Sequence, residues 1–238
     1  MLNFGKGEQA LDGHKYIAEN LKRIQENVEN AVVKAGRKDS PCIIAVTKTV
    51  PPEKVNYAID LGISVLGENK VQEYLSKREL YNPSAKIHFI GNLQTNKIKQ
   101  IAPYINFVES ANSVNLLQKL SNCYKNFGKF ADILIELNVG REIGKTGADT
   151  DTLPELLDAA KSLDNICLKG LMTLPPPSDD PSPYFYGLAE LAAKYSGYFP
   201  DKPILSMGTS LDYPTAVEYG ATHIRIGTAL FGKRDYTT

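Results

Sequence analysis

The sequence predicts a (β/α)8 barrel, or TIM barrel, preceded by one extra helix. Two observations carry this prediction: short apolar runs alternate with amphipathic segments along the chain, and eight such runs can be counted. Alternation of this kind indicates βαβ units and a parallel sheet, and eight units close into a barrel. The alternative is an open doubly wound sheet, which the lack of a G-x-G-x-x-G sequence after the first strand disfavours.

One domain is expected to span residues 1–238. A length of 238 residues with 42% hydrophobic residues fits a soluble domain with a full core. No linker or strong internal repeat divides the chain, and the Pro-rich segment 175–183 is too short to separate two domains.

The extra helix is predicted over residues 14–36, and Gly36 ends it. Apolar residues recur in this segment at steps of three and four, which places them on one helix face. They are Ile17, Leu21, Ile24, Val28 and Val32.

The first strand is predicted over residues 42–47, where an almost wholly apolar run follows Pro41. Such runs suit strands that are buried on both faces in a parallel sheet. A helix over residues 51–61 follows, opened by two prolines and closed by Gly62. The next strand–helix pairs are 64–67 with 70–80, 86–90 with 96–102, and 105–109 with 114–124.

The second half of the chain continues the alternation. A loop with glycines over 140–147 and the Pro-rich loop over 175–183 interrupt it. The predicted pairs are strand 132–138 with helix 153–163, strand 166–174 with helix 185–195, and strand 203–207 with helix 213–219, before the eighth strand over 223–227.

Composition argues against several function classes. Lys and Arg total 27 and Asp and Glu total 27, so the basic excess typical of nucleic-acid or membrane-surface binding is missing. No apolar stretch approaches the roughly 18 residues of a membrane span. Residues 1–6 lack the apolar run of a signal peptide, so a cytoplasmic location is expected. Three widely spaced cysteines disfavour both disulfides and a zinc site, and no metal is expected.

Lys48 directly follows the first strand, and in a barrel the C-terminal ends of the strands form the active site. Burial at that level penalises the charged ammonium, and a neutral amine is the nucleophile that forms a Schiff base with a carbonyl. The alternative is a lysine that extends from the strand end to solvent.

The loops after strands seven and eight predict a phosphate site, because barrels often bind phosphate there. Gly208 and Gly227 allow backbone N–H groups to approach oxygen atoms closely, and Ser210 and Thr228 add hydroxyl donors. The alternative is a pair of ordinary turns.

Arg225 lies two residues before Gly227, so the alternation of a strand places both on the barrel interior. An arginine inside a barrel is costly without a partner. It is therefore expected either to donate to a bound ligand or to form a structural ion pair with Glu68 or Glu109.

A Schiff-base lysine, a phosphate site and an inward arginine together favour pyridoxal 5′-phosphate (PLP), which carries an aldehyde, a phosphate and a ring nitrogen. The alternative at this stage is a barrel similar to a class I aldolase, which would use the lysine and the phosphate site on a sugar phosphate.

Six stretches in order along the chain match a known family. They are 45–49 (AVTKT), 67–73 (GENKVQE), 88–97 (HFIGNLQTNK), 170–172 (GLM), 205–210 (LSMGTS) and 224–232 (IRIGTALFG). Through them the chain resembles the pyridoxal phosphate homeostasis proteins, which share the barrel of the alanine racemase N-terminal domain.

The resemblance implies a set of cofactor-binding residues and no assigned catalytic residue. Lys48 would form the internal aldimine, Asn69 would lie near the ring, and Arg225 would face the pyridine nitrogen. A guanidinium accepts no proton, so that nitrogen stays unprotonated and the ring is a weaker electron sink. With the residues near the phosphate, the predicted set is Lys48, Asn69, Met207, Ser210, Arg225, Gly227 and Thr228.

Three positions depart from the family pattern. Asn92 stands where proline is usual, Thr209 where methionine is usual, and Leu211 where aspartate is usual. These changes flank the predicted site and replace none of its lysine, arginine or phosphate-binding residues.

The implied function is intracellular vitamin B6 and PLP homeostasis, with PLP held by the protein and no robust turnover. Alanine racemases need a second domain whose tyrosine is the opposite-face base, and this chain ends at Thr238, soon after the eighth strand. The alternative is a PLP-dependent amino-acid racemase or related enzyme of weak activity. The expected partners are PLP and PLP-dependent apoenzymes, and the expected state is a monomer or weak dimer.

Overall fold

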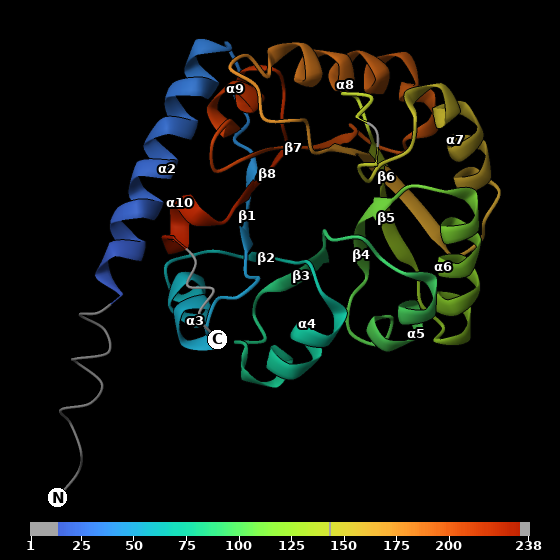
Figure 1. Ribbon diagram of the computed structural model, residues 1–238, viewed down its shortest axis with the longest axis horizontal. Helices are drawn as coiled ribbons and strands as arrows, with labels where there is room; N and C mark the ends of the chain where they lie inside the picture. The colour runs from blue at the N-terminus through green and yellow to red at the C-terminus, as the bar shows by residue number, and fades with distance from the viewer. Residues whose placement is uncertain (1–13, 143, 234–238) are drawn as a thin grey trace, which may run out of the picture.

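The computed structural model describes residues 14–142 and 144–233 of the chain, and it forms a closed parallel barrel (Figure 1). Each strand pairs with the next, and β8 pairs with β1 through Cys42 and His223, which closes the sheet. The prediction of a (β/α)8 barrel is therefore confirmed. The strands are β1 (Cys42–Val46), β2 (Val65–Glu68), β3 (Lys86–Phe89), β4 (Phe107–Ala111), β5 (Ala131–Leu137), β6 (Ile166–Thr173), β7 (Ile204–Thr209) and β8 (His223–Ile226).

Helices surround the barrel and connect successive strands (Figure 1). They are α2 (Lys15–Lys34), α3 (Pro52–Asp60), α4 (Val71–Lys77), α5 (Ile98–Ile101), α6 (Val114–Asn126), α7 (Leu153–Lys161), α8 (Ser182–Lys194), α9 (Tyr213–Glu218) and α10 (Thr228–Phe231). Short 3-10 turns lie beside them at η1 (Arg78–Leu80), η2 (Thr95–Lys97), η3 (Thr150–Thr152) and η4 (Ser196–Tyr198).

Beyond shifts of one or two residues at helix ends, four helical segments differ from the sequence predictions. The predicted helices 70–80 and 96–102 each divide into an α-helical and a 3-10 part. Helix α8 begins at Ser182, inside the predicted Pro-rich loop, because proline is well tolerated in the first helical turn and Pro183 stands there. Helix α10, directly after β8, was not predicted.

The extra helix α2 packs on the outside of the barrel against α9 and α10 (Figure 1). Its predicted apolar face is buried, with Ile17 at 0% exposure. Its polar side chains form hydrogen bonds with α10. Asn20 Nδ2 donates to the carbonyl of Leu230 at 3.0 Å, and Tyr16 OH donates to the carbonyl of Phe231 at 3.1 Å. The helix therefore holds the segment that follows β8, where the phosphate site was predicted.

The barrel interior is unusually polar. Helix-facing strand side chains such as Leu66, Ile133 and Ile224 form the apolar core with the helices. The interior of a TIM barrel is commonly filled by branched apolar residues. Here it contains a hydrogen bond from Ser206 on β7 to Glu109 on β4, which must cross the interior because these strands are not neighbours. Other inward polar groups are His88, Glu136 and Arg225.

The ends of the predicted domain, residues 1–13 and 234–238, lie outside the described residues, as does residue 143. Within the described residues, none of the helices combines the length and apolar character needed to cross a bilayer.

The packing of α2 can be tested with two valines on the same helix. Val28 is 5% exposed and Val33 is 72% exposed. We expect Val28→Ala to lower the free energy of unfolding by about 2 kcal/mol, because it removes buried methyl groups and leaves a cavity. Val33→Ala should change it by less than about 0.5 kcal/mol. Urea unfolding measures both, and equal effects would contradict the docking of this helix.

Candidate functional site

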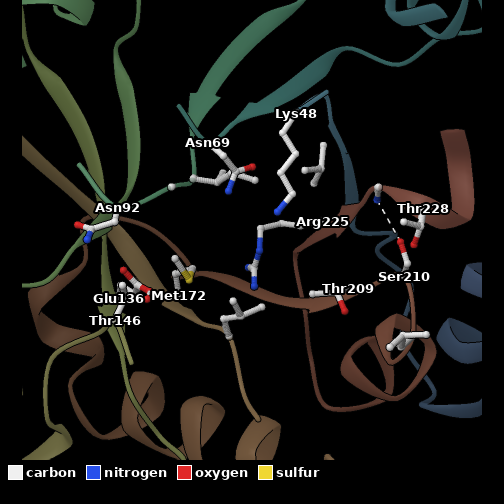
Figure 2. Close-up of a pocket in the computed structure, with 16 residues that line it drawn as sticks. Lys48, Asn69, Asn92, Glu136, Thr146, Met172, Thr209, Ser210, Arg225 and Thr228 are labelled. Carbon is white, nitrogen blue, oxygen red and sulfur yellow. Dashed lines mark hydrogen bonds between the residues drawn. The ribbon is translucent and has the colours of Figure 1, made fainter. Parts of the chain in front are cut away.

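A pocket of about 410 Å³ opens at the C-terminal ends of the barrel strands, within the size range of small-molecule sites. It collects residues from seven of the eight strand ends, which only a closed barrel brings together. Six of the seven predicted cofactor residues line it: Lys48, Asn69, Ser210, Arg225, Gly227 and Thr228. Figure 2 shows Lys48 extending into this pocket toward Arg225.

The seventh predicted residue, Met207, lies elsewhere. Its side chain is fully buried in the core between the barrel and the helices, and it is not among the residues that line the pocket. Along β7, Ser206 points into the barrel, so the neighbouring Met207 points outward. A role for Met207 in cofactor binding stays a prediction that its backbone alone could fulfil.

The segment after β1 that carries Lys48 is fixed by contacts from α4. Thr49 has a φ of 62°, a left-handed conformation that is uncommon for a β-branched residue. Its N–H donates to Glu73 Oε1 at 2.5 Å, and Lys77 Nζ donates both to that oxygen at 2.5 Å and to the Val50 carbonyl at 3.1 Å. Burial alone would raise the pKa of Glu73, but the bonds from Lys77 and Thr49 lower it. An ionised Glu73 therefore holds Thr49 in this conformation and Lys48 in place.

Asn69 follows β2 and lines the same pocket, close to the chain after β3. A Cβ at Gly91 would stand only 2.1 Å from the backbone oxygen of Asn69, so this approach requires glycine. The Oδ1 atom of Asn69 is buried and has no hydrogen-bond partner in the structure. A buried polar atom of this kind is expected to find a partner, and a ligand in the pocket could supply it.

The loops after β7 and β8 meet at the hydroxyl of Ser210. Its Oγ accepts a hydrogen bond from the N–H group of Gly227 at 3.1 Å, drawn as a dashed line in Figure 2. It accepts a second one from the N–H group of Ala229, also at 3.1 Å. Thr228 lines the pocket between them. Two N–H groups that converge on one oxygen, with two hydroxyl groups beside them, form a cradle suited to an anionic oxygen.

Gly208 does not belong to this cradle. It has a φ of 90°, and a Cβ there would stand 2.6 Å from the Cβ of Ala216 in α9. Glycine at this position allows β7 to pack closely on α9. Gly208 does not line the pocket, so the structure gives no support for the predicted approach of its N–H group to phosphate.

Arg225 is 5% exposed and lies at the floor of the pocket. Its Nη1 donates to Ser206 Oγ and its Nη2 to the Thr173 carbonyl, both at 2.7 Å. Glu109 therefore connects with Arg225 through Ser206 and makes no direct pair with it. Glu68 faces the helices, where it accepts from Thr47 and Tyr81. Of the two alternatives for Arg225, the structural ion pair with Glu68 or Glu109 is therefore not observed.

Glu136 is a pocket residue that the sequence analysis missed. It lies near the end of β5, is 4% exposed, and accepts a hydrogen bond from Thr146 Oγ1 at 2.7 Å. Burial raises the pKa of Glu136, so it keeps its proton to higher pH than an ordinary carboxyl. Alternation along the predicted strand 132–138 would have placed it inward.

The three positions that depart from the family pattern all border the pocket. Thr209 is engaged by Asp212, which accepts both its N–H at 2.6 Å and its hydroxyl at 2.9 Å. Leu211 is 91% exposed at the rim. Below the pocket, His88 Nδ1 lies 2.6 Å from Glu109 Oε1.

Comparison with known proteins gives consistent results. The alanine racemase N-terminal domain matches residues 20–235. The chain is 40% identical over 225 residues to a pyridoxal phosphate homeostasis protein of Aquifex aeolicus, covering 92% of this chain and 98% of that protein. Among solved structures, a protein of unknown function from Bifidobacterium adolescentis matches with a TM-score of 0.86 and 29% identity, over 92% of this chain and 95% of that one. PipY of Synechococcus elongatus, solved with PLP bound, matches with a TM-score of 0.78 and 28% identity, over 91% of this chain and all of PipY (100%).

The cradle can be tested through stability alone. Ser210→Ala removes the acceptor of the Gly227 and Ala229 N–H groups, and we expect it to lower the free energy of unfolding by about 1 kcal/mol, as loss of a helix cap does. Ser196→Ala, at an exposed serine, is the control. Chemical denaturation measures both, and no difference between the two variants would contradict the bonds assigned to Ser210.

Proposed function

The chain belongs to the family of pyridoxal phosphate homeostasis proteins, built on the alanine racemase N-terminal domain, and from this premise we propose that it holds PLP in the barrel pocket. One observation carries the proposal to this chain: a lysine, an anion cradle and an inward arginine line the same cavity. These are the three groups needed for the aldehyde, phosphate and ring nitrogen of that cofactor.

Lys48 supplies the amine in this proposal. It would hold PLP through the aldehyde carbon, with the aldehyde oxygen released as water. The Glu73 contact with Thr49 keeps Lys48 at the pocket, so that its amine meets the carbonyl in a fixed orientation.

The phosphate binds at the cradle formed by Ser210, Gly227 and Thr228. The Gly227 and Ala229 N–H groups already converge on one oxygen, and α2 holds this segment from outside. Asn69 borders the ring on the other side of the pocket, where its buried Oδ1 can find a partner.

Arg225 donates to the ring nitrogen and cannot give it a proton. When bound, PLP supplies an electron sink, and an unprotonated ring nitrogen weakens that sink. Among the described residues, the ionisable side chains that line the pocket are Lys48, Glu136 and Arg225. Of these three, Arg225 is the residue that supports a protein which stores and releases the cofactor with little turnover.

The proposal extends to the cellular role. One domain over residues 1–238 carries PLP in the cytoplasm, as a monomer or weak dimer, and delivers it to PLP-dependent apoenzymes. Leu174 and Leu211, which are 52% and 91% exposed, border the pocket, so its rim lies at the protein surface where such a transfer could occur.

A weak amino-acid racemase is the second candidate, and Glu136 is the observation that favours it. A racemase needs proton-transfer groups on both faces of the substrate, and Glu136 is a buried carboxyl in the same pocket as Lys48. Burial raises the pKa of Glu136, so it holds its proton to higher pH than an ordinary carboxyl, as a general acid requires.

Cofactor binding is tested by mixing PLP with the purified protein and recording its absorbance. We expect a band from lysine-bound PLP in the wild type and in Lys70→Ala, an exposed lysine of the same rim, and none in Lys48→Ala. Borohydride reduction followed by peptide mapping should place the cofactor on Lys48. A wild type without the band, or a band that survives Lys48→Ala, would reject the assignment.

The choice between carrier and racemase is tested by hydrogen exchange at Cα. PLP-loaded protein is incubated with several amino acids in D₂O, and NMR follows deuterium incorporation. We expect no exchange above that of free PLP, because the weakened electron sink disfavours loss of the Cα proton. Exchange that exceeds this level and is lost in Glu136→Gln would establish the racemase instead.

A further inference from the structure

A buried chain of hydrogen bonds leads from Arg225, at the pocket floor, to residues that do not line the pocket. Arg225 Nη1 donates to Ser206 Oγ at 2.7 Å, and Ser206 Oγ donates to Glu109 Oε2 at 2.5 Å. The other oxygen of Glu109 lies 2.6 Å from His88 Nδ1. Among these four residues, only Arg225 reaches the pocket.

The direction of these bonds follows from the donor and acceptor inventory. A guanidinium only donates, and a serine hydroxyl has one proton. Ser206 must therefore accept from Arg225 and give its own proton to Glu109. Without an acceptor at Glu109, this hydroxyl would be free to rotate, and its lone pairs would no longer be fixed toward Arg225.

The charges of the two ends reinforce the arrangement. Glu109 is fully buried, and although burial raises its pKa, the bond with His88 and the nearby Arg225 lower it below the ordinary value. The group is thus a carboxylate in the barrel interior. A buried positive charge at Arg225 needs such a counter-charge, and Glu109 provides it from below the pocket.

The guanidinium is therefore held from two sides. Ser206 binds Nη1 and the Thr173 carbonyl binds Nη2, both at 2.7 Å. A guanidinium carries five N–H donors, so these two contacts leave donors for a ligand above. The orientation of the guanidinium plane is therefore set by Ser206 and Thr173, which lie below the pocket.

We propose that Glu109 is a positioning residue for the ring-nitrogen contact of the bound cofactor, acting through Ser206 and Arg225. The inference rests on the proposed binding of PLP. Glu109 touches no ligand. Its carboxylate fixes the Ser206 hydroxyl and balances the Arg225 charge, so that the guanidinium meets the ring nitrogen in one orientation.

The test compares PLP with its 1-deaza analogue, in which carbon replaces the ring nitrogen. Absorbance titration gives the affinity of each ligand for each variant. The wild type should bind PLP more tightly than the analogue. Glu109→Gln, of nearly equal shape, should weaken PLP binding by about tenfold, the effect of losing one good hydrogen bond. It should leave the affinity for the analogue within about twofold.

Two further variants sharpen the result. Glu68→Gln is the matched control, because Glu68 is an equally buried carboxyl on the helix side of the barrel, and it should keep the wild-type preference for PLP. Ser206→Ala interrupts the same chain of hydrogen bonds with a smaller change in the side chain, and it should lose the preference for PLP as Glu109→Gln does. This second variant keeps the proposal testable if Glu109→Gln fails to fold.

Each remaining outcome overturns the positioning role. If Glu109→Gln weakens the binding of PLP and of the analogue equally, Glu109 has a general structural role. If both Glu109→Gln and Ser206→Ala keep the wild-type preference for PLP over the analogue, Glu109 does not act through Arg225. A wild type that binds neither ligand would instead overturn the proposed function itself, so the two failures are distinguishable.

Discussion

The burial of one positive charge inside a closed barrel is the constraint on which the site depends. Arg225 sits almost without solvent contact among parallel strands, where an unpaired guanidinium would be strongly unfavourable. The structure meets this demand with Ser206 and the carbonyl of Thr173 as direct partners and Glu109 as counter-charge. These partners come from β4, β6 and β7, so the charge is satisfied only where the curved sheet brings three strands around Arg225.

The periphery of the barrel supports the same pocket. Helix α2 forms hydrogen bonds with α10 through Asn20 and Tyr16. Glu73 of α4 accepts a hydrogen bond from the N–H group of Thr49, in the turn after β1. Thr49 is next to Lys48, and the α2 contacts lie within three residues of Thr228, so both act on backbone close to pocket residues. Binding groups held by rigid elements keep their geometry better than groups on free loops, which suits a site that must align three parts of one ligand.

Much of this architecture could be predicted, because it follows from periodicity. The eight apolar runs became the eight strands, and the rule that barrel sites lie at strand ends brought Lys48, Asn69 and Arg225 into one pocket. The side chain of Met207 lies elsewhere, because it points outward on β7, where the register with β8 shifts between Ser206 and Thr209. The bond between Ser206 and Glu109 joins residues 97 positions apart, and no local pattern in the sequence encodes that distance.

The Ser210 hydroxyl has a consequence for the strength of binding. Because its oxygen already accepts hydrogen bonds from the N–H groups of Gly227 and Ala229, the phosphate proposed to bind here would have to displace an acceptor that belongs to the chain itself. The net gain is then the difference between two acceptors rather than the whole value of new hydrogen bonds. Such internal competition would limit the affinity for phosphate, and the serine would take over the N–H groups again as the anion departs. This behaviour suits the proposed release of the cofactor.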